Sequence, residues 1–194
     1  MPNVVVLSRY RVLGPVRITG KPAAPCPPKA RELLALLVLN ANRPVRYAEI
    51  ARELWAGDPP PSARANVRTY AAGLRQAGAR VTATGDGYWL ATDPHDIDLV
   101  RFRAAAARGR ALRGAGDRVG AIEAFRAAAA MWRGQALDGI PVGMLLRPWK
   151  AALDQERAAL GEELANLLGS RRSTGPVPAF DRDHRAAGLT AAAG

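Results

Sequence analysis

The segment SARANVRTYAAGLRQAG, Ser62–Gly78, contains three arginines, one tyrosine and no acidic residue. At about 100° per residue, its apolar residues fall within about 60° of one another, which predicts the core-facing side of an amphipathic helix. These apolar residues are Ala63, Val67, Tyr70 and Leu74. A different side carries Arg64, Arg68 and Arg75 within about 40° of one another, by the same geometry. The segment therefore predicts a helix with a cationic side that no acid of its own neutralises.

The two ends of this helix carry residues that are typical of helix boundaries. The hydroxyl of Ser62 is expected to accept a hydrogen bond from a first-turn amide, and Gly78 stands where a C-terminal glycine is common. Taken alone, the cationic side could equally be a solvated charged surface. The neighbouring segments have to distinguish this alternative from a binding surface.

Those neighbours predict a winged helix-turn-helix. Alternating apolar residues from Tyr10, interrupted by Gly14-Pro15, predict two or three short antiparallel strands. The segments KARELLALLVLN and YAEIARELW predict a buried helix and a short amphipathic helix, and RVTATGDGYWLAT predicts a tight hairpin. Only about five residues separate the short helix from the arginine helix, so the latter is free to enter a major groove while the hairpin forms a wing.

The distribution of charge places a polyanion partner on this first half. The formal net charge is +11, and residues 1–92 hold 13 Lys and Arg against 5 Asp and Glu. Residues 93–169 are nearly balanced, with 11 against 10. Such an excess indicates nucleic acid or an anionic membrane surface as the partner.

Other features of the composition predict a cytoplasmic protein. The single cysteine, Cys26, cannot form an internal disulfide, which fits a reducing compartment. No apolar run approaches the roughly 20 residues of a membrane span, and the N-terminus lacks the pattern of a signal peptide.

The second half has a different character and predicts an all-α module. The polar segment TDPHDID marks a boundary, after which residues 97–169 predict a helical hairpin of tetratricopeptide size followed by a long helix. Residues 170–194 show little periodicity and predict a disordered tail. The expected fold class is α+β, with a winged helix-turn-helix over residues 1–93 and helices thereafter.

Several blocks of the chain resemble a known family. KARELLALLVLNANRPV, EIARELWAGDPPPSARANVRTYAAGLRQ, GDGYWL, DLVRFRAAAARGRALRGAGD and AFRAAAAMWRGQAL occur in the order and spacing of the small antibiotic-regulatory (SARP-type) activators of actinobacteria. That family joins an OmpR-like winged helix-turn-helix to a tetratricopeptide-like bacterial transcriptional activator domain. The resemblance implies binding to direct repeats near promoters and contact with RNA polymerase. Two molecules side by side on direct repeats imply a monomer or weak homodimer that pairs on DNA.

Candidate DNA contacts follow from the residue types in the arginine helix and from the family resemblance. Arginine forks bond guanine edges or phosphates, so Arg64, Arg68 and Arg75 are predicted DNA contacts. The resemblance adds Asn66 and Thr69 in the same helix. It also implies that the stiff loop Gly57, Asp58, Pro59, Pro60 and Pro61 touches RNA polymerase, the alternative being a plain rigid connector.

Further candidates lie in the wing and the flanking helices. Thr82 and Thr84 could reach the minor groove or a phosphate, or be ordinary strand residues. Four more cations could meet backbone phosphates, although solvation is the favoured reading for each: Lys29, Arg31, Arg43 and Arg46. Three tryptophans at apolar helical spacing are predicted core anchors, namely Trp55, Trp132 and Trp149. Tyr70 is predicted to lie in the core, and Trp89 to pack on the helices.

Three departures from the family pattern predict weaker DNA binding than is typical. The second domain is shorter, Gly73 interrupts the arginine helix at a cost of about 1 kcal/mol relative to alanine, and Asp86 puts an acid near the DNA backbone. The shorter domain leaves two alternatives to an activator: an antagonist that occupies DNA sites without activating, and a helical scaffold that has lost DNA binding.

The residues give no support to an enzyme, a cofactor or a metal. GPVRITGKP imitates a phosphate-binding loop, but it has five residues between the glycines where four are needed, and Pro22 replaces the magnesium-binding Ser or Thr. His95 and His184 stand without neighbours at metal-ligand spacing.

Overall fold

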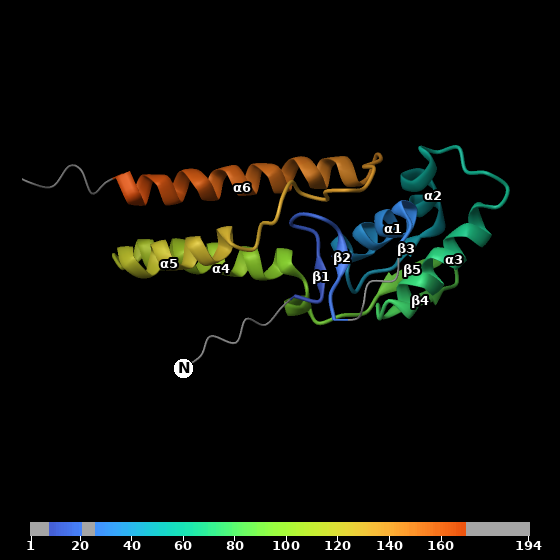
Figure 1. The fold of residues 1–194 in the computed structure, drawn as a ribbon, viewed down its shortest axis with the longest axis horizontal. Helices are drawn as coiled ribbons and strands as arrows, with labels where there is room; N and C mark the ends of the chain where they lie inside the picture. Colours follow the sequence, from blue (N-terminus) through green and yellow to red (C-terminus); the bar gives the residue numbers. More distant parts are fainter. Residues whose placement is uncertain (1–7, 21–25, 170–194) are drawn as a thin grey trace, which may run out of the picture.

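The computed structural model describes residues 8–20 and 26–169 and shows an α+β protein with two unlike halves. Helices and a small sheet form one half, three long helices form the other, and two short strands lie between them (Figure 1). The predicted fold class is therefore confirmed. The strands are β1 (Tyr10–Arg11), β2 (Arg17–Ile18), β3 (Val45–Arg46), β4 (Val81–Thr84) and β5 (Gly87–Leu90). The helices are α1 (Pro28–Leu39), α2 (Tyr47–Trp55), α3 (Ala63–Gln76), a 3₁₀ turn η1 (Pro94–Asp96), α4 (Asp98–Gly114), α5 (Arg118–Ala129) and α6 (Leu146–Gly169).

The first half begins with the predicted antiparallel pair of strands. β1 pairs with β2, with Tyr10 opposite Ile18. The alternating apolar residues Tyr10, Val12 and Val16 are fully or almost fully buried. β1 therefore points its apolar face into the core, as the period of two requires.

Helix α1 is the buried centre of the first half. Leucine, valine and alanine occupy nearly all its sides, so neighbours cover it all round, as the sequence predicts. Pro28 lies in its first turn, where a missing amide N–H leaves no hydrogen bond unmade. Because α3 and α2 both pack on α1, this helix fixes the position of the arginine helix relative to the rest of the molecule.

The predicted hairpin forms a three-stranded sheet with a short strand from the helix-turn-helix. The order is β3-β5-β4, and the pairing of Thr84 with Gly87 leaves Gly85 and Asp86 in the turn. β3 lies so close to β5 that a Cβ atom built on Gly87 would be 2.0 Å from the Val45 carbonyl oxygen. Glycine is therefore the residue that permits β3 to pair with the wing.

Replacing Gly87 by alanine should destabilise the protein by about 1–3 kcal/mol, because backbone must move to admit the methyl group. Urea denaturation followed by tryptophan fluorescence measures the change. Gly85→Ala is the matched control, because a Cβ on Gly85 meets nothing within 4 Å. Equal stability of the two variants would contradict the close approach of β3 and β5.

The second half is a helical hairpin, α4 and α5, with α6 packed against it (Figure 1). Phe125 of α5 lies against the backbone of α4 at Gly109, where a Cβ would come within 2.4 Å of the phenyl ring. Trp132 meets the Phe102 ring edge-on, with the ring centroids 5.4 Å apart. Ion pairs between Arg103 and Glu156, at 2.6 Å, and from Glu163 to two arginines join α4 to α6.

Three expectations for the helices need correction. The segment RVGAIEAFRAAAAMWRG predicts a helix through Trp132 with Ala129 facing inward, but α5 ends at Ala129 and is followed by a turn at Ala130 and Met131. Ala129 is exposed, and the buried face of α5 is Ala121, Phe125 and Ala128. The reason is that the ring of Phe125 fits over Gly109 and thereby sets the rotation of the helix. The predicted core anchors Trp55, Trp132 and Trp149 are only half-buried, and Trp55 and Trp132 pack against the core from its margin.

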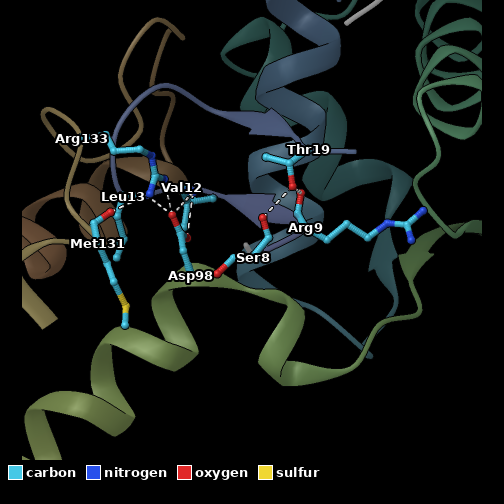
Figure 2. Close-up of polar contacts among 8 residues, drawn as sticks. All are labelled: Ser8, Arg9, Val12, Leu13, Thr19, Asp98, Met131 and Arg133. Atoms are coloured by element: carbon cyan, nitrogen blue, oxygen red, sulfur yellow. Dashed lines mark hydrogen bonds and ion pairs between the residues drawn. The ribbon is translucent and has the colours of Figure 1, made fainter. Parts of the chain in front are cut away.

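A buried carboxylate, Asp98, ties the two halves together. Its side chain is 2% exposed and accepts hydrogen bonds from the amides of Val12 and Leu13, at 3.0 and 3.2 Å. Arg133 donates to it from the other side at 2.5 Å, and Figure 2 shows these groups converging on the carboxylate. Backbone hydrogen bonds from residues 133–138 to residues 12–14 also join the two halves next to Asp98.

A second carboxylate, Glu53, holds the start of α6. It is 2% exposed and accepts from the amides of Gly143 and Leu145, both at 2.6 Å, and of Leu146 at 3.2 Å. Free first-turn amides need such an acceptor. Helix α2 therefore supplies the N-terminal cap of a helix in the other half. A single cluster of buried apolar residues also includes members of both halves.

Within the described ranges, no helix is both long and apolar enough to cross a bilayer. The predicted disordered tail, residues 170–194, lies outside the described residues.

Candidate nucleic-acid interface

Helix α3 has the buried and exposed sides that its sequence predicts. Ala63, Val67, Ala71 and Leu74 are fully buried, and Tyr70 is half-buried at their margin. The helix ends in a left-handed Gly78, with φ of 96°. The amides of Gly78 and Ala79 bond back to the carbonyls of Arg75 and Leu74, both at 2.9 Å, which forms a Schellman motif.

The expected N-cap is different. The Ser62 hydroxyl caps no backbone amide and instead accepts from the side-chain amide of Asn66 at 3.2 Å. Ser62 has helical backbone angles, with φ −81° and ψ −2°, whereas the capping interaction requires an extended residue.

Arg64 and Arg68 are brought together beside the wing. Both are exposed, and both line a pocket of about 250 Å³ between α3 and the wing turn. The wall on the other side includes Thr84 and Asp86. The guanidinium of Arg64 lies 4.0 Å from the centre of the Tyr47 ring, a cation–π contact that limits its freedom.

Sequence reasoning missed Tyr47. It lies 17 residues before Arg64, and no local sequence pattern predicts the contact between the two side chains. Its amide also donates to the Asp86 carbonyl at 2.7 Å, which joins the start of α2 to the wing turn. Tyr47 therefore sets both the direction of Arg64 and the position of the turn that faces it.

Arg75 lies on the same side of α3 but is engaged within the protein. Its Nε donates to the Val81 carbonyl at 2.6 Å, which connects the last turn of the helix to β4. Arg75 is exposed, so its remaining N–H groups still face solvent. Its geometry is that of a brace between the helix and the wing.

The two candidates from the resemblance lie away from the arginines. Asn66 is half-buried, bonded to Ser62, and about 160° around the helix from Arg68. Thr69 is exposed, and its hydroxyl donates to the Ala65 carbonyl at 3.1 Å. The structure therefore groups Arg64, Arg68 and Thr84 and sets Asn66 apart. Thr82 is exposed on β4, outside the pocket lining.

The other predicted contact residues vary in availability. Lys29 is drawn inward: its ammonium bonds the Leu54 carbonyl and lies 5.5 Å from the centre of the Trp55 ring. Arg43 and Arg46 are exposed near the wing sheet, whereas Arg31 is partly buried. The five residues of the loop Gly57–Pro61 are all exposed between α2 and α3.

The candidate site is an exposed cationic surface between α3 and the wing turn. Among residues 8–20 and 26–169, no cluster of three or more His, Cys, Asp or Glu has the arrangement of a metal site. The exposed guanidinium groups of α3, the wing turn and the cleft between them have the form of a site for an anionic, extended ligand.

Comparisons with known proteins find similar transcriptional regulators. Residues 97–174 match the family described as "bacterial transcriptional activator domain". The chain is 34% identical over 158 residues to the transcriptional regulatory protein EmbR of Mycobacterium tuberculosis, covering 76% of this chain and 41% of that protein. It is 34% identical over 168 residues to the regulatory protein AfsR of Streptomyces coelicolor, covering 84% and 16%. It is 30% identical over 169 residues to the regulatory protein DnrI of Streptomyces peucetius, covering 79% and 62%.

A solved structure is also similar. The chain superposes on Mycobacterium tuberculosis EmbR in complex with a low-affinity phosphopeptide with a TM-score of 0.76 and 31% identity, over 84% of this chain and 46% of that one. The chain spans about two fifths of the length of the EmbR proteins that it matches.

Proposed function

We propose, from the match of residues 97–174 to the bacterial transcriptional activator domain and from the similarity to AfsR and DnrI, that the chain is a SARP-type regulator that binds specific sequences of double-stranded DNA. In this proposal, residues 1–93 bind direct repeats near promoters, and residues 97–169 act as the activator domain. The function is binding rather than catalysis, and the protein acts in the cytoplasm.

The observation that carries the proposal is the cationic side of α3 beside the wing. Arg64 and Arg68 project from the second helix of a helix-turn-helix, and neither forms an ion pair with another described residue. By contrast, Arg103, Arg110 and Arg113 of α4 are paired with glutamates of α6. Unpaired arginines at the position of a recognition helix are what phosphates and guanine edges require.

The proposal predicts steep salt dependence of DNA binding. Fluorescence anisotropy with promoter-region duplexes, from low salt to about 0.2 M, should give a slope of log affinity on log salt of about −0.9 per neutralised phosphate. Arg68→Ala should weaken binding to the preferred duplex by about 1–3 kcal/mol.

Arg108→Ala is the matched control for this experiment. Arg108 is an exposed arginine on α4, remote in sequence from the helix-turn-helix, so its removal changes net charge equally. Its replacement should leave binding nearly unchanged. A shallow salt slope without sequence preference, or equal effects of the two variants, would refute the proposal and favour a helical interaction scaffold.

Activation is a further part of the proposal. The exposed loop Gly57–Pro61 is proposed to contact RNA polymerase, because its three prolines leave little entropy to lose on docking. Two molecules would pair side by side on direct repeats as a weak homodimer. A promoter–reporter assay distinguishes an activator, which raises output, from an antagonist, which occupies the site and lowers it.

A further inference from the structure

Most polar side chains on the exposed surface of α3 are already engaged inside the protein. Arg64 rests on the Tyr47 ring and Arg75 bonds the Val81 carbonyl. Asn66 bonds Ser62, and the Thr69 hydroxyl bonds the Ala65 carbonyl. Two long polar side chains differ from these: Arg68 and Gln76 are exposed, and neither makes a hydrogen bond or ion pair with another described residue.

These two residues lie on one row of the helix. Arg68, Ala72 and Gln76 are spaced at i, i+4 and i+8, and successive members are offset by about 40° around the axis. Ala72 lies midway, with a methyl group that keeps the helix surface low between the two polar side chains. Gly73 beside it has open space where a Cβ would be, so internal packing does not explain its lack of a side chain.

We propose that Arg68 and Gln76 are the residues of α3 that read bases, Arg68 a guanine and Gln76 an adenine about three to four base pairs away. This inference rests on the proposed DNA-binding function. The chemistry follows from donor patterns: a guanidinium fork matches guanine O6 and N7, and a glutamine amide matches adenine N7 and N6. The low surface at Ala72 admits a thymine methyl between them.

The spacing follows from helix geometry. Eight residues rise about 12 Å along the axis, and stacked bases are about 3.4 Å apart, so the two side chains reach positions about three to four base pairs apart. The other arginines receive different roles. Tyr47 holds Arg64 against the wing cleft, where a phosphate would lie, and Arg75 positions β4 relative to the helix.

The test maps each side chain to one base pair. The wild-type protein first selects a preferred sequence from a pool of randomised duplexes. Affinities are then measured for that duplex and for every single-base substitution, with the wild type, Arg68→Lys and Gln76→Ala. Lysine keeps the phosphate-seeking charge of Arg68 but lacks its planar fork.

We expect a preferred guanine and a preferred adenine three to four base pairs apart. Replacing either base should weaken wild-type binding by about tenfold or more. Arg68→Lys should lose discrimination at the guanine only, with an unchanged salt slope, and Gln76→Ala at the adenine only. Arg108→Ala, on α4 and outside the helix-turn-helix, is the control and should keep both preferences.

Different results would contradict the DNA-binding function and the assignment of Arg68 and Gln76 to bases. If the wild type binds no duplex at low salt, the proposed function is wrong. If it selects a sequence but Gln76→Ala and Arg68→Lys discriminate every base as the wild type does, the DNA-binding function stands and this assignment is overturned. Loss of discrimination in Arg108→Ala would also overturn it.

Discussion

Replacing Asp98 by alanine is expected to lower the free energy of unfolding by about 3–5 kcal/mol, the usual range when one partner of a buried ion pair is removed. The carboxylate is almost fully buried and serves the amides of Val12 and Leu13 together with the guanidinium of Arg133 (Figure 2). Alanine would leave these donors without their acceptor at the start of α4. The desolvation of each unmet donor, rather than the lost ion pair alone, makes the effect large.

Asp117→Ala is the matched control for Asp98→Ala. Asp117 is also an aspartate at a helix N-terminus, where it accepts from the Gly120 amide at 2.8 Å, but it is exposed. Its removal should cost only about 1 kcal/mol, the usual value of an N-cap. Urea denaturation of both variants and the wild type decides the matter. If the two aspartates prove equally dispensable, Asp98 does not hold the two halves together.

The parts of the fold that follow from local pattern could be predicted from the sequence. Apolar residues at helical spacing placed Val67 and Leu74 in the core, and Gly78 marked the end of α3. The pairing of Thr84 with Gly87 follows from the short Gly85-Asp86 turn. These features depend on residues within a few positions of each other, where backbone preferences and periodicity act directly.

The candidate site and the contacts between the two halves depend on residues that are far apart in the sequence, so local patterns do not predict them. Tyr47 and Arg64 are 17 positions apart, and Glu53 meets amides 90 or more positions away. In sequence, Glu53 looks like one more charged residue of an amphipathic helix, which would place it in solvent. It is buried because three amides need an acceptor there: those of Gly143 and Leu145, just before α6, and that of Leu146, its first residue. The sequence likewise predicts the same role for Arg75 and Arg68, because both lie on the cationic side of α3. The structure separates them, since Arg75 donates to the Val81 carbonyl.

The buried carboxylate of Glu32, on α1, should make stability depend on pH near neutrality. Burial raises its pKa from 4.5 to about 7, Lys29 opposes this rise, and the neighbouring Glu53 adds to it. One of its oxygens, Oε2, has no hydrogen-bond partner among the described residues, and the nearest cation, Lys29, is 3.9 Å away. The ionised form of Glu32 is therefore poorly compensated in the folded protein.

The direction of the pH effect follows from the raised pKa. Below about pH 4.5 the carboxyl is protonated in the folded and the unfolded chain, and its contribution to stability is fully present. Between 4.5 and about 7 the unfolded chain releases the proton while the folded chain keeps it. Each pH unit in this window then removes about 1.4 kcal/mol, which totals up to about 3 kcal/mol. Above about pH 7 the loss levels off.

Glu32→Gln keeps the shape of the side chain but cannot ionise, so it should remove this loss. Urea denaturation from about pH 5 to about pH 8 should show the variant close to the wild type at the acidic end and more stable than it at the basic end, by up to about 3 kcal/mol. Glu49→Gln is the control, because Glu49 is exposed and its carboxylate accepts from the Arg46 amide at 2.8 Å. If the curves of Glu32→Gln and the wild type run parallel across this range, Glu32 ionises in the folded protein as freely as in water. Burial of Glu32 and its closeness to Glu53 would then have no effect on the pH dependence of stability.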